Sequence, residues 1–310
     1  MDAVRSSAPD PVEFRSAIPG VRHICGHDIH ITIGLSLAEG FAAVRQRLAG
    51  TIMFVFQPAE ESAIGARAMI ADGVFRDTMP GAIFAYHTAP ISVGQLATAP
   101  EIMMAGRDRV QVTLSGSGDL EGVAREVRRR IQSVGTITPQ QAVTPAPPGF
   151  VLAEVDQPSQ AEAGAFAVSA WITTADSGTR ARTRQEIEGH LAQLKRDGIT
   201  LSIDYQERFI AGVTNDPGLV REATASAGSV IGTEAVLNLD GVFPAYSEDF
   251  GSFQDVVPGV MFFLGVSNPE KGWVGIPHSP GYVADEESIF IGAEVMAAIL
   301  LDQLSGGESK

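Results

Sequence analysis

Cysteine and positive charge are scarce in this 310-residue sequence. A single cysteine cannot form an internal disulfide, so no disulfide-stabilised scaffold of an oxidising compartment is predicted. Lys and Arg number 22 against 37 Asp and Glu, which gives a formal net charge of −15. This acidic balance argues against a nucleic-acid partner, which needs a basic surface, and against binding to an anionic membrane.

Long apolar runs are also missing from the sequence. The first residues, MDAVRSSAPDPVEF, contain no apolar core of a secretory signal. Continuous apolar runs such as residues 260–266 are too short to cross a bilayer. We therefore expect a cytoplasmic protein. Hydrophobic residues make up 45% and charged residues 19%, which is typical of folded domains, and the length predicts roughly two of them.

Strand and helix patterns alternate in the first hundred residues. Apolar residues at helical spacing predict a helix over 30–48, ended by Gly50. The run TIMFVF (51–56) predicts a strand buried on both faces, and AIFAY (82–86) predicts another. The same character returns after residue 208, with a buried strand at 260–265 and a closing helix over 285–304. The fold class is therefore predicted to be α/β, with a mostly parallel sheet.

The pattern changes between residues 108 and 207. Residues 108–115 (DRVQVTLS) alternate apolar and polar side chains with period two, as a half-exposed strand does. The elements that follow give the order β-α-β-β-α-β, which is the ferredoxin-like βαββαβ unit. We predict that 108–207 form a separate domain inserted into a discontinuous catalytic domain, which comprises 1–107 and 208–310.

The residues suited to chemistry gather in short motifs. HICGHDIH (23–30) holds three histidines and the only cysteine, AYHTAP places His87 at the end of a strand, and GIPHSPG places His278 in a loop. Glu60 and Glu61 follow the apolar run 51–56 directly, in QPAEES. The carboxyl ends of strands are where α/β folds bind their ligands.

Thiol, imidazole and carboxylate groups together bind Zn²⁺ and also serve Mn²⁺, Co²⁺ or Ni²⁺. The predicted ligands of two such divalent transition metals are Cys25, His27, Glu61, His87 and His278. A two-metal centre activates water for hydrolysis, and Glu60 is the predicted general base. Taken singly, each residue also fits an ordinary role: a buried thiol packs as a small hydrophobe, and paired glutamates often begin a helix. The joint pattern favours metals.

The motifs HICGHDIH, FVFQPAEES, AYHTAP, YSEDFGSF and IPHSP together resemble those of the M20 metallopeptidase family, and most closely its amidohydrolase branch. That branch includes hippurate hydrolases, N-acyl-amino-acid amidohydrolases and auxin-conjugate hydrolases. The resemblance implies the same five ligands and the same base, a small N-acyl-amino acid or amide as substrate, and an inserted lid that often forms a homodimer. It also implies supporting roles beside the ligands for Asp2, Asp28, Glu248 and Asp249.

The predicted lid departs from the family pattern. SGSGDLEG (115–122) has neither His nor Pro where the family carries a histidine that helps to stabilise the oxyanion. Losing one such donor typically lowers the rate by about 10²–10³. Three functions are therefore kept open. The first is a metal-dependent hydrolase of N-acyl-amino acids. The second is a degenerate member that acts as a binding or assembly protein. The third is a tailoring enzyme that uses the same metal site.

Overall fold

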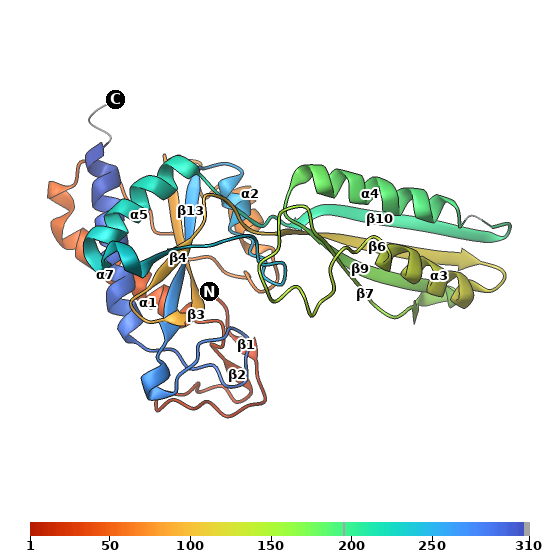
Figure 1. Cartoon of the computed structure of the whole chain (residues 1–310), viewed down its shortest axis with the longest axis horizontal. Helices are drawn as coiled ribbons and strands as arrows, with labels where there is room; N and C mark the ends of the chain where they lie inside the picture. The colour runs from red at the N-terminus through yellow and green to blue at the C-terminus, as the bar shows by residue number, and fades with distance from the viewer. Residues whose placement is uncertain (195, 307–310) are drawn as a thin grey trace. The chain divides into compact units, whose positions relative to one another are not determined.

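The computed structural model describes residues 1–194 and 196–306. The chain divides into two compact units (Figure 1). The first unit comprises Met1–Glu101, Asn215–Leu239 and Phe253–Lys310, and the second comprises Ile102–Thr214 and Asp240–Ser252.

The bounds of these units differ from the predicted ones. Residues 240–252, expected in the catalytic domain, belong to the second unit, as do residues 102–107 and 208–214. Backbone contacts explain the first difference, because Val242 forms a bridge with Ala146 and Phe243 forms one with Met104. Such pairing joins segments far apart in sequence, so local patterns did not reveal it.

A four-stranded sheet organises the first unit. Its strands are β3 (Ile83–Ser92), β4 (Leu96–Thr98), β12 (Val236–Asn238) and β13 (Gly259–Ser267), in the order β12-β4-β13-β3. β12 pairs with β4 and β13 pairs with β3 in parallel, whereas β13 and β4 are antiparallel, so the sheet is mixed. Every residue of β13 is buried, which explains its continuous apolar sequence.

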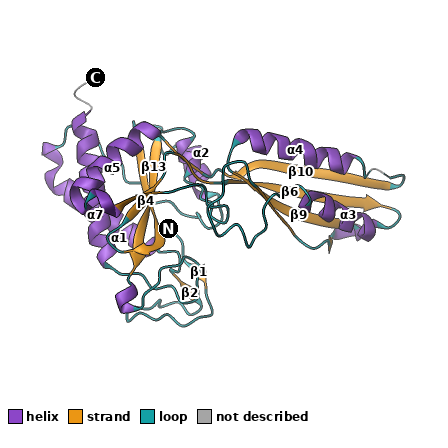
Figure 2. Cartoon of the chain, viewed as in Figure 1, coloured by secondary structure: helices purple, strands orange, loops and turns teal. Residues whose placement is uncertain are grey.

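Three helices pack on this sheet (Figure 2): α1 (His27–Val44), α5 (Pro217–Ile231) and α7 (Glu287–Gly306). Their shared core includes Ile33, Phe262 and Ile299. α7 is long and apolar enough to cross a membrane, which the sequence prediction had excluded by considering only continuous apolar runs. Here α7 contacts α1, α5 and β13, the arrangement of a helix that covers a sheet.

The predicted strand at 51–56 is wrong. Residues 51–57 form no ladder with any strand in the described part of the chain, and Met53 and Phe56 are exposed to 36% and 39%. Ile52 and Phe54 still pack partly against the core. A continuous apolar run indicates that its side chains contact a hydrophobic core. A strand forms only where a neighbouring backbone is also available for hydrogen bonding.

The second unit contains a sheet with helices packed against it. Its elements are β6 (Gly106–Gly116), α3 (Leu120–Gln132), β7 (Val151–Val155), β8 (Ser159–Gln160), β9 (Phe166–Thr174), α4 (Ser177–Ala192) and β10 (Ile199–Ile210). The main strands lie in the order β10-β6-β9-β7 with every pairing antiparallel, and the short β8 pairs with β9. Asp119 and Asp176 cap the amino ends of α3 and α4.

The remaining elements are short. β1 (Val4–Arg5) pairs with β2 (Val21–Arg22), and β5 (Glu101–Met104) pairs with β11 (Val213–Asn215), where the chain passes between the units. The other helices are α2 (Gly65–Asp72), α6 (Gly251–Gln254) and the 3₁₀ turns Arg45–Arg47, Glu162–Gly164, Thr233–Ala235 and Pro269–Lys271.

Candidate metal centre

A tight loop before α1 carries two of the predicted ligands. Gly26, between Cys25 and His27, has φ of 77°, a left-handed conformation that suits glycine. Two contacts fix this loop from outside. The Thr88 hydroxyl donates to the Cys25 carbonyl at 2.8 Å, and the His278 backbone N–H donates to the carbonyl of Ile24 at 2.7 Å. The loop that carries His278 and the strand β3 therefore both form hydrogen bonds to the loop that carries Cys25.

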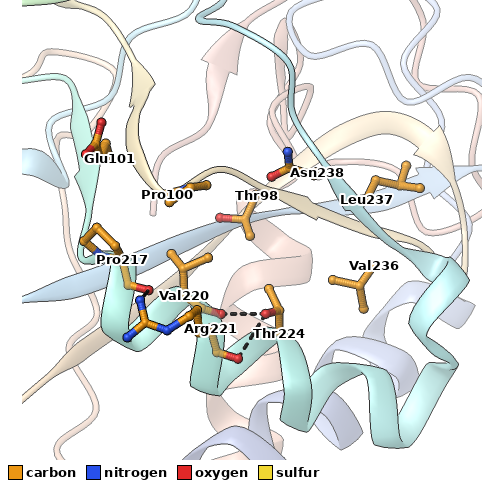
Figure 3. Close-up of a pocket in the computed structure, with 10 residues that line it drawn as sticks. All are labelled: Thr98, Pro100, Glu101, Pro217, Val220, Arg221, Thr224, Val236, Leu237 and Asn238. Carbon is orange, nitrogen blue, oxygen red and sulfur yellow. Dashed lines mark hydrogen bonds between the residues drawn. The ribbon is translucent and has the colours of Figure 1, made fainter.

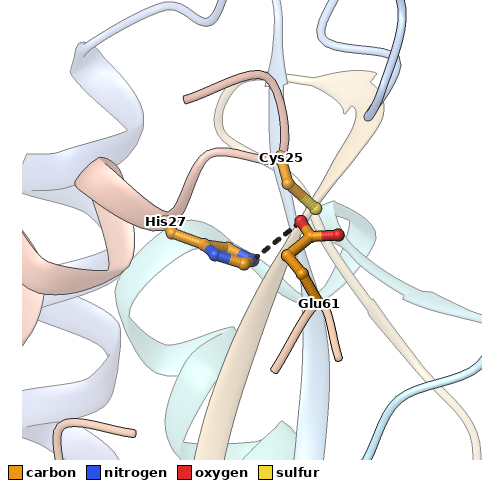
Figure 4. A group of neighbouring side chains, drawn as sticks. All are labelled: Cys25, His27 and Glu61. Atoms are coloured by element: carbon orange, nitrogen blue, oxygen red, sulfur yellow. Dashed lines mark ion pairs between the residues drawn. The ribbon is translucent and has the colours of Figure 1, made fainter. Parts of the chain in front are cut away.

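All five predicted ligands converge within the first unit. Ligand atoms of Cys25, His27 and Glu61 lie within 4.8 Å of one another (Figure 4). The Cys25 Sγ is 3.7 Å from His87 Nε2, and Glu61 Oε1 is 3.5 Å from His278 Nε2. Side chains from four separate segments of the chain thus meet at one place.

Glu60 lies beside the same cluster. Its Oε2 is 3.5 Å from His27 Nε2, while Glu61 Oε1 is 4.0 Å from that atom. The carboxylates of Glu60 and Glu61 therefore both lie near the imidazole of His27. The Glu60 side chain is 19% exposed, so solvent reaches it.

Asp2 holds the glutamate loop and the cysteine loop together. Its carboxylate accepts backbone N–H bonds from Ala59 at 2.8 Å and Glu61 at 3.0 Å, and its own N–H donates to His27 Nδ1 at 3.0 Å. Burial alone would raise the pKa of Asp2, but the two N–H donors outweigh it and the pKa is lowered. Asp2 therefore contacts both His27 and the backbone beside Glu61, and its supporting role stays a prediction.

Burial lowers the pKa of two of the imidazoles in the cluster, those of His27 and His87. Burial, followed by the nearby His87, lowers the pKa of His27 to about 4. Burial also lowers the pKa of His87, whose Nδ1 lies 2.7 Å from the Thr88 carbonyl. A donor on Nδ1 leaves the lone pair on Nε2, which faces Cys25, and this is the form in which histidine binds a metal. Burial raises the pKa of Glu61.

His30 and Thr88 lie beside the cluster and were not among the predicted site residues. His30 Nε2 accepts the backbone N–H of Thr88 at 3.1 Å, and Thr88 in turn supports Cys25. Both residues flank predicted ligands, since Thr88 follows His87 and His30 lies one helical turn after His27. That adjacency was the only available signal.

The other predicted supporting residues are Asp28, Glu248 and Asp249. Burial raises the pKa of Asp28, whose charge interacts with His23, Asp10 and Tyr282; no described contact joins it to a predicted ligand side chain. Glu248 and Asp249 are buried in the second unit, where the Glu248 carboxylate accepts the backbone N–H of Phe250 at 3.1 Å. For all three, the supporting role stays a prediction.

The fold and the cluster define the class of protein: an α/β enzyme whose site joins a thiol, imidazoles and carboxylates. The family model described as peptidase family M20/M25/M40 matches residues 1–302, so the chain belongs to this family. Its relatives place it in the amidohydrolase branch.

Two relatives illustrate this branch. IAA-amino acid hydrolase ILR1-like 4 of Arabidopsis thaliana is 27% identical over 96% of this chain and 70% of its own length. An N-acetyldiaminopimelate deacetylase of Streptococcus thermophilus is 31% identical over 90% of this chain and 74% of its own.

A solved structure supports the fold. The Bacillus subtilis YXEP protein, described as a dinuclear metal-binding peptidase of the M20 family, aligns with a TM-score of 0.76 at 22% identity. The alignment covers 98% of this chain and 79% of that protein.

Proposed function

We propose that this protein is a metal-dependent hydrolase that cleaves the amide bond of an N-acyl-amino acid or a related small amide. The convergence of Cys25, His27, Glu61, His87 and His278 beside Glu60 carries the proposal. The relatives support the substrate class, because their names describe the hydrolysis of amino-acid conjugates and the removal of acetyl groups from amino acids.

The five side chains fit a pair of divalent transition metals. They combine a soft thiolate, borderline imidazoles and a hard carboxylate, which suits Zn²⁺ or Mn²⁺ and also Co²⁺ or Ni²⁺. Bound there, the metals would lower the pKa of water and polarise the amide carbonyl. His27 faces the carboxylates through Nε2, so ligation at that atom requires its neutral ring to carry the proton on Nδ1. The contact from the Asp2 N–H must therefore open.

Glu60 would move the proton. Its carboxylate lies at the edge of the cluster and is partly exposed, so it can take a proton from water and deliver it to the leaving amine. Glu61 is held differently, because its backbone N–H is bound by Asp2 and its carboxylate lies between His27 and His278. We therefore assign Glu60 as the general base and Glu61 as a metal ligand.

The second unit would act as a lid and as the surface through which two copies form a homodimer. Its turn between β6 and α3 contains Gly116 and Gly118, both at positive φ, and Asp119, which caps α3. The turn offers no imidazole to an oxyanion. We therefore expect slower turnover than in members that carry the lid histidine, by about 10²–10³.

The test is hydrolysis of a panel of N-acetyl- and N-benzoyl-amino acids by protein loaded with Zn²⁺ or Mn²⁺. Glu60→Gln should lower kcat/KM by about 10²–10⁴ while leaving the metal content unchanged. Glu39→Gln, an exposed change on α1, is the matched control and should have no effect. Undiminished hydrolysis by Glu60→Gln would remove the proposed mechanism.

The altered turn at 116–119 also favours a second candidate, a binding or assembly protein that keeps the metals but has lost turnover. Wild-type protein that binds metal yet hydrolyses no member of the panel would establish this alternative. A tailoring enzyme would instead form or rearrange an amide with the same metal site. It would be recognised by new products in the same assays.

A further inference from the structure

The residue that follows the predicted ligand His87 lies on the edge strand of a sheet. β3 is the last strand in the order β12-β4-β13-β3, so its outer side has no partner strand in the described part of the chain. Buried backbone N–H groups on such an edge need an acceptor from elsewhere. Thr88 is fully buried and donates its N–H to His30 Nε2 at 3.1 Å. A side chain of α1 therefore binds the backbone of β3 directly beside a ligand.

Thr88 also contacts two predicted ligands. Its hydroxyl donates to the Cys25 carbonyl at 2.8 Å, and its own carbonyl lies 2.7 Å from His87 Nδ1. Branching at Cβ restricts the χ1 angle of threonine, which helps to fix the direction of the hydroxyl. The polar groups of this one residue thus connect three segments that meet at the cluster: α1, the loop that carries Cys25, and β3.

His30 is close to the cluster, but its acceptor nitrogen is used to bind β3. The centroid of its ring lies 5.5 Å from that of His27 and 6.0 Å from that of His87. A neutral imidazole has a single acceptor nitrogen. In His30 this is Nε2, which accepts the N–H of Thr88, and the same lone pair cannot also bind an ion. His30 therefore supports the cluster from outside the ligand set.

These contacts fix two ligands at a spacing that one metal ion can use. Cys25 Sγ lies 3.7 Å from His87 Nε2. Two ligands of one tetrahedral Zn²⁺, with bonds of about 2.3 Å to sulfur and about 2.1 Å to nitrogen, lie about 3.6 Å apart. Ligands held at the required spacing bind an ion more tightly than ligands that must first be ordered, because less conformational freedom is lost on binding.

We propose that His30 and Thr88 are positioning residues that fix Cys25 and His87 at the spacing of a shared metal ion. His30 holds the β3 backbone, and Thr88 joins that backbone to the Cys25 loop. Neither residue touches the ion or the substrate. The inference rests on the proposed metal centre and adds to it two residues outside its ligand set. Loss of either contact should therefore lower metal affinity by more than a loss of stability alone explains.

The experiment compares two buried threonines of the first unit. Thr88→Val removes the hydroxyl with little change in volume. Thr98→Val is the matched control: Thr98 is 2% exposed, its hydroxyl donates to the Met261 carbonyl at 2.8 Å, and it also accepts from Asn215. Thr98 lies on β4 beside a cavity (Figure 3), and none of the residues that line this cavity is a predicted ligand. The control therefore loses at least as many hydrogen bonds, but away from the cluster.

Metal affinity is measured with Co²⁺ by competition against a chelator, and thermal melts of each metal-free variant report its stability. Thr88→Val should bind Co²⁺ about 10–100-fold more weakly than the wild type, as is typical when a partner of a metal ligand is lost. Thr98→Val should lower the Tm at least as much and leave the Co²⁺ affinity unchanged. Thr88→Ser keeps the hydroxyl and should restore most of the affinity.

The absorption spectrum of the Co²⁺ protein gives a second readout. A thiolate bound to Co²⁺ produces a charge-transfer band in the near ultraviolet, so this band reports the bond from Cys25. At saturating Co²⁺ the band should be weaker or shifted in Thr88→Val and in His30→Leu, which removes the acceptor of the Thr88 N–H, and it should be normal in Thr98→Val and Thr88→Ser.

Two kinds of failure are distinguishable. A wild type that binds no Co²⁺ would overturn the metal centre and this inference with it. A wild type that binds Co²⁺, with the same affinity and the same band in Thr88→Val, would overturn only the positioning role. An equal loss of affinity in Thr88→Val and Thr98→Val would do so as well, because it would show a general effect of stability.

Discussion

Replacing Gly26 by alanine should both destabilise the first unit and weaken metal binding. A Cβ on Gly26 would lie 2.4 Å from the Tyr282 hydroxyl, 2.5 Å from Thr88 Oγ1 and 2.6 Å from Thr88 Cγ2. Neither neighbour can move easily, since Thr88 is fully buried and Tyr282 is 6% exposed. The left-handed φ of Gly26 adds backbone strain.

Two effects of Gly26→Ala add together. The left-handed conformation costs about 1–2 kcal/mol for a residue with a side chain, and overpacking a buried site costs about 1–3 kcal/mol. The sum is about 2–5 kcal/mol, and each kcal/mol lowers the Tm by about 2–4 °C in a domain of about 150–250 residues. Because Cys25 and His27 flank the site, a displacement of about 1 Å would also lower activity by about 10².

The assay is thermal unfolding followed by circular dichroism, with metal content measured on the same samples. Tyr282→Phe removes the nearest atom, so Gly26→Ala/Tyr282→Phe should recover part of the loss. Gly40→Ala, within α1, is the control and should raise stability slightly, because a Cβ there would meet no described atom within 4 Å. A Gly26→Ala protein with unchanged Tm and metal content would refute the proposed crowding.

Other predictions test the electrostatics. Asp108 is fully buried and lies 3.2 Å from Arg180 Nε, so Asp108→Ala should lower the free energy of unfolding by about 3–5 kcal/mol by leaving the Arg180 guanidinium, which is only 11% exposed, without its carboxylate partner. Urea unfolding measures this loss, and Asp108→Ala/Arg180→Leu should be less destabilised than the sum of the single changes. Burial lowers the pKa of His27 from 6.5 to about 4, so folded metal-free protein binds fewer protons than unfolded protein between these values. Its stability should therefore fall as the pH drops from about 6.5 to about 4, with a shallower slope in His27→Gln, and an equal slope in both proteins would contradict the assignment.

The periodic spacing of apolar residues predicted most helices and strands, because this spacing follows from which side chains of each element are buried. The predicted helix at 30–48 corresponds to α1, and the apolar run at 260–265 lies within β13. The same reasoning failed at 51–56, where apolar side chains reach the core but the backbone has no strand partner among the described residues. It also failed at 240–252, whose place depends on bridges to distant residues.

The part of the candidate site that depends on residue type and motif could be predicted from the sequence. Cys25, His27 and Glu61 were chosen as metal ligands by type and motif, and the structure brings their ligand atoms together. The contacts of Thr88 with His30 and Cys25 could not be predicted, because backbone N–H and carbonyl partners leave no mark in the sequence.

The central claim is that these side chains form a metal centre, and its most direct test is the metal content of the protein. Elemental analysis of the wild type, dialysed after loading with Zn²⁺ or Mn²⁺, should find about two ions per chain, and fewer in Cys25→Ser and His278→Ala. A wild-type protein that retains no metal, or variants that retain as much as the wild type, would contradict the claim.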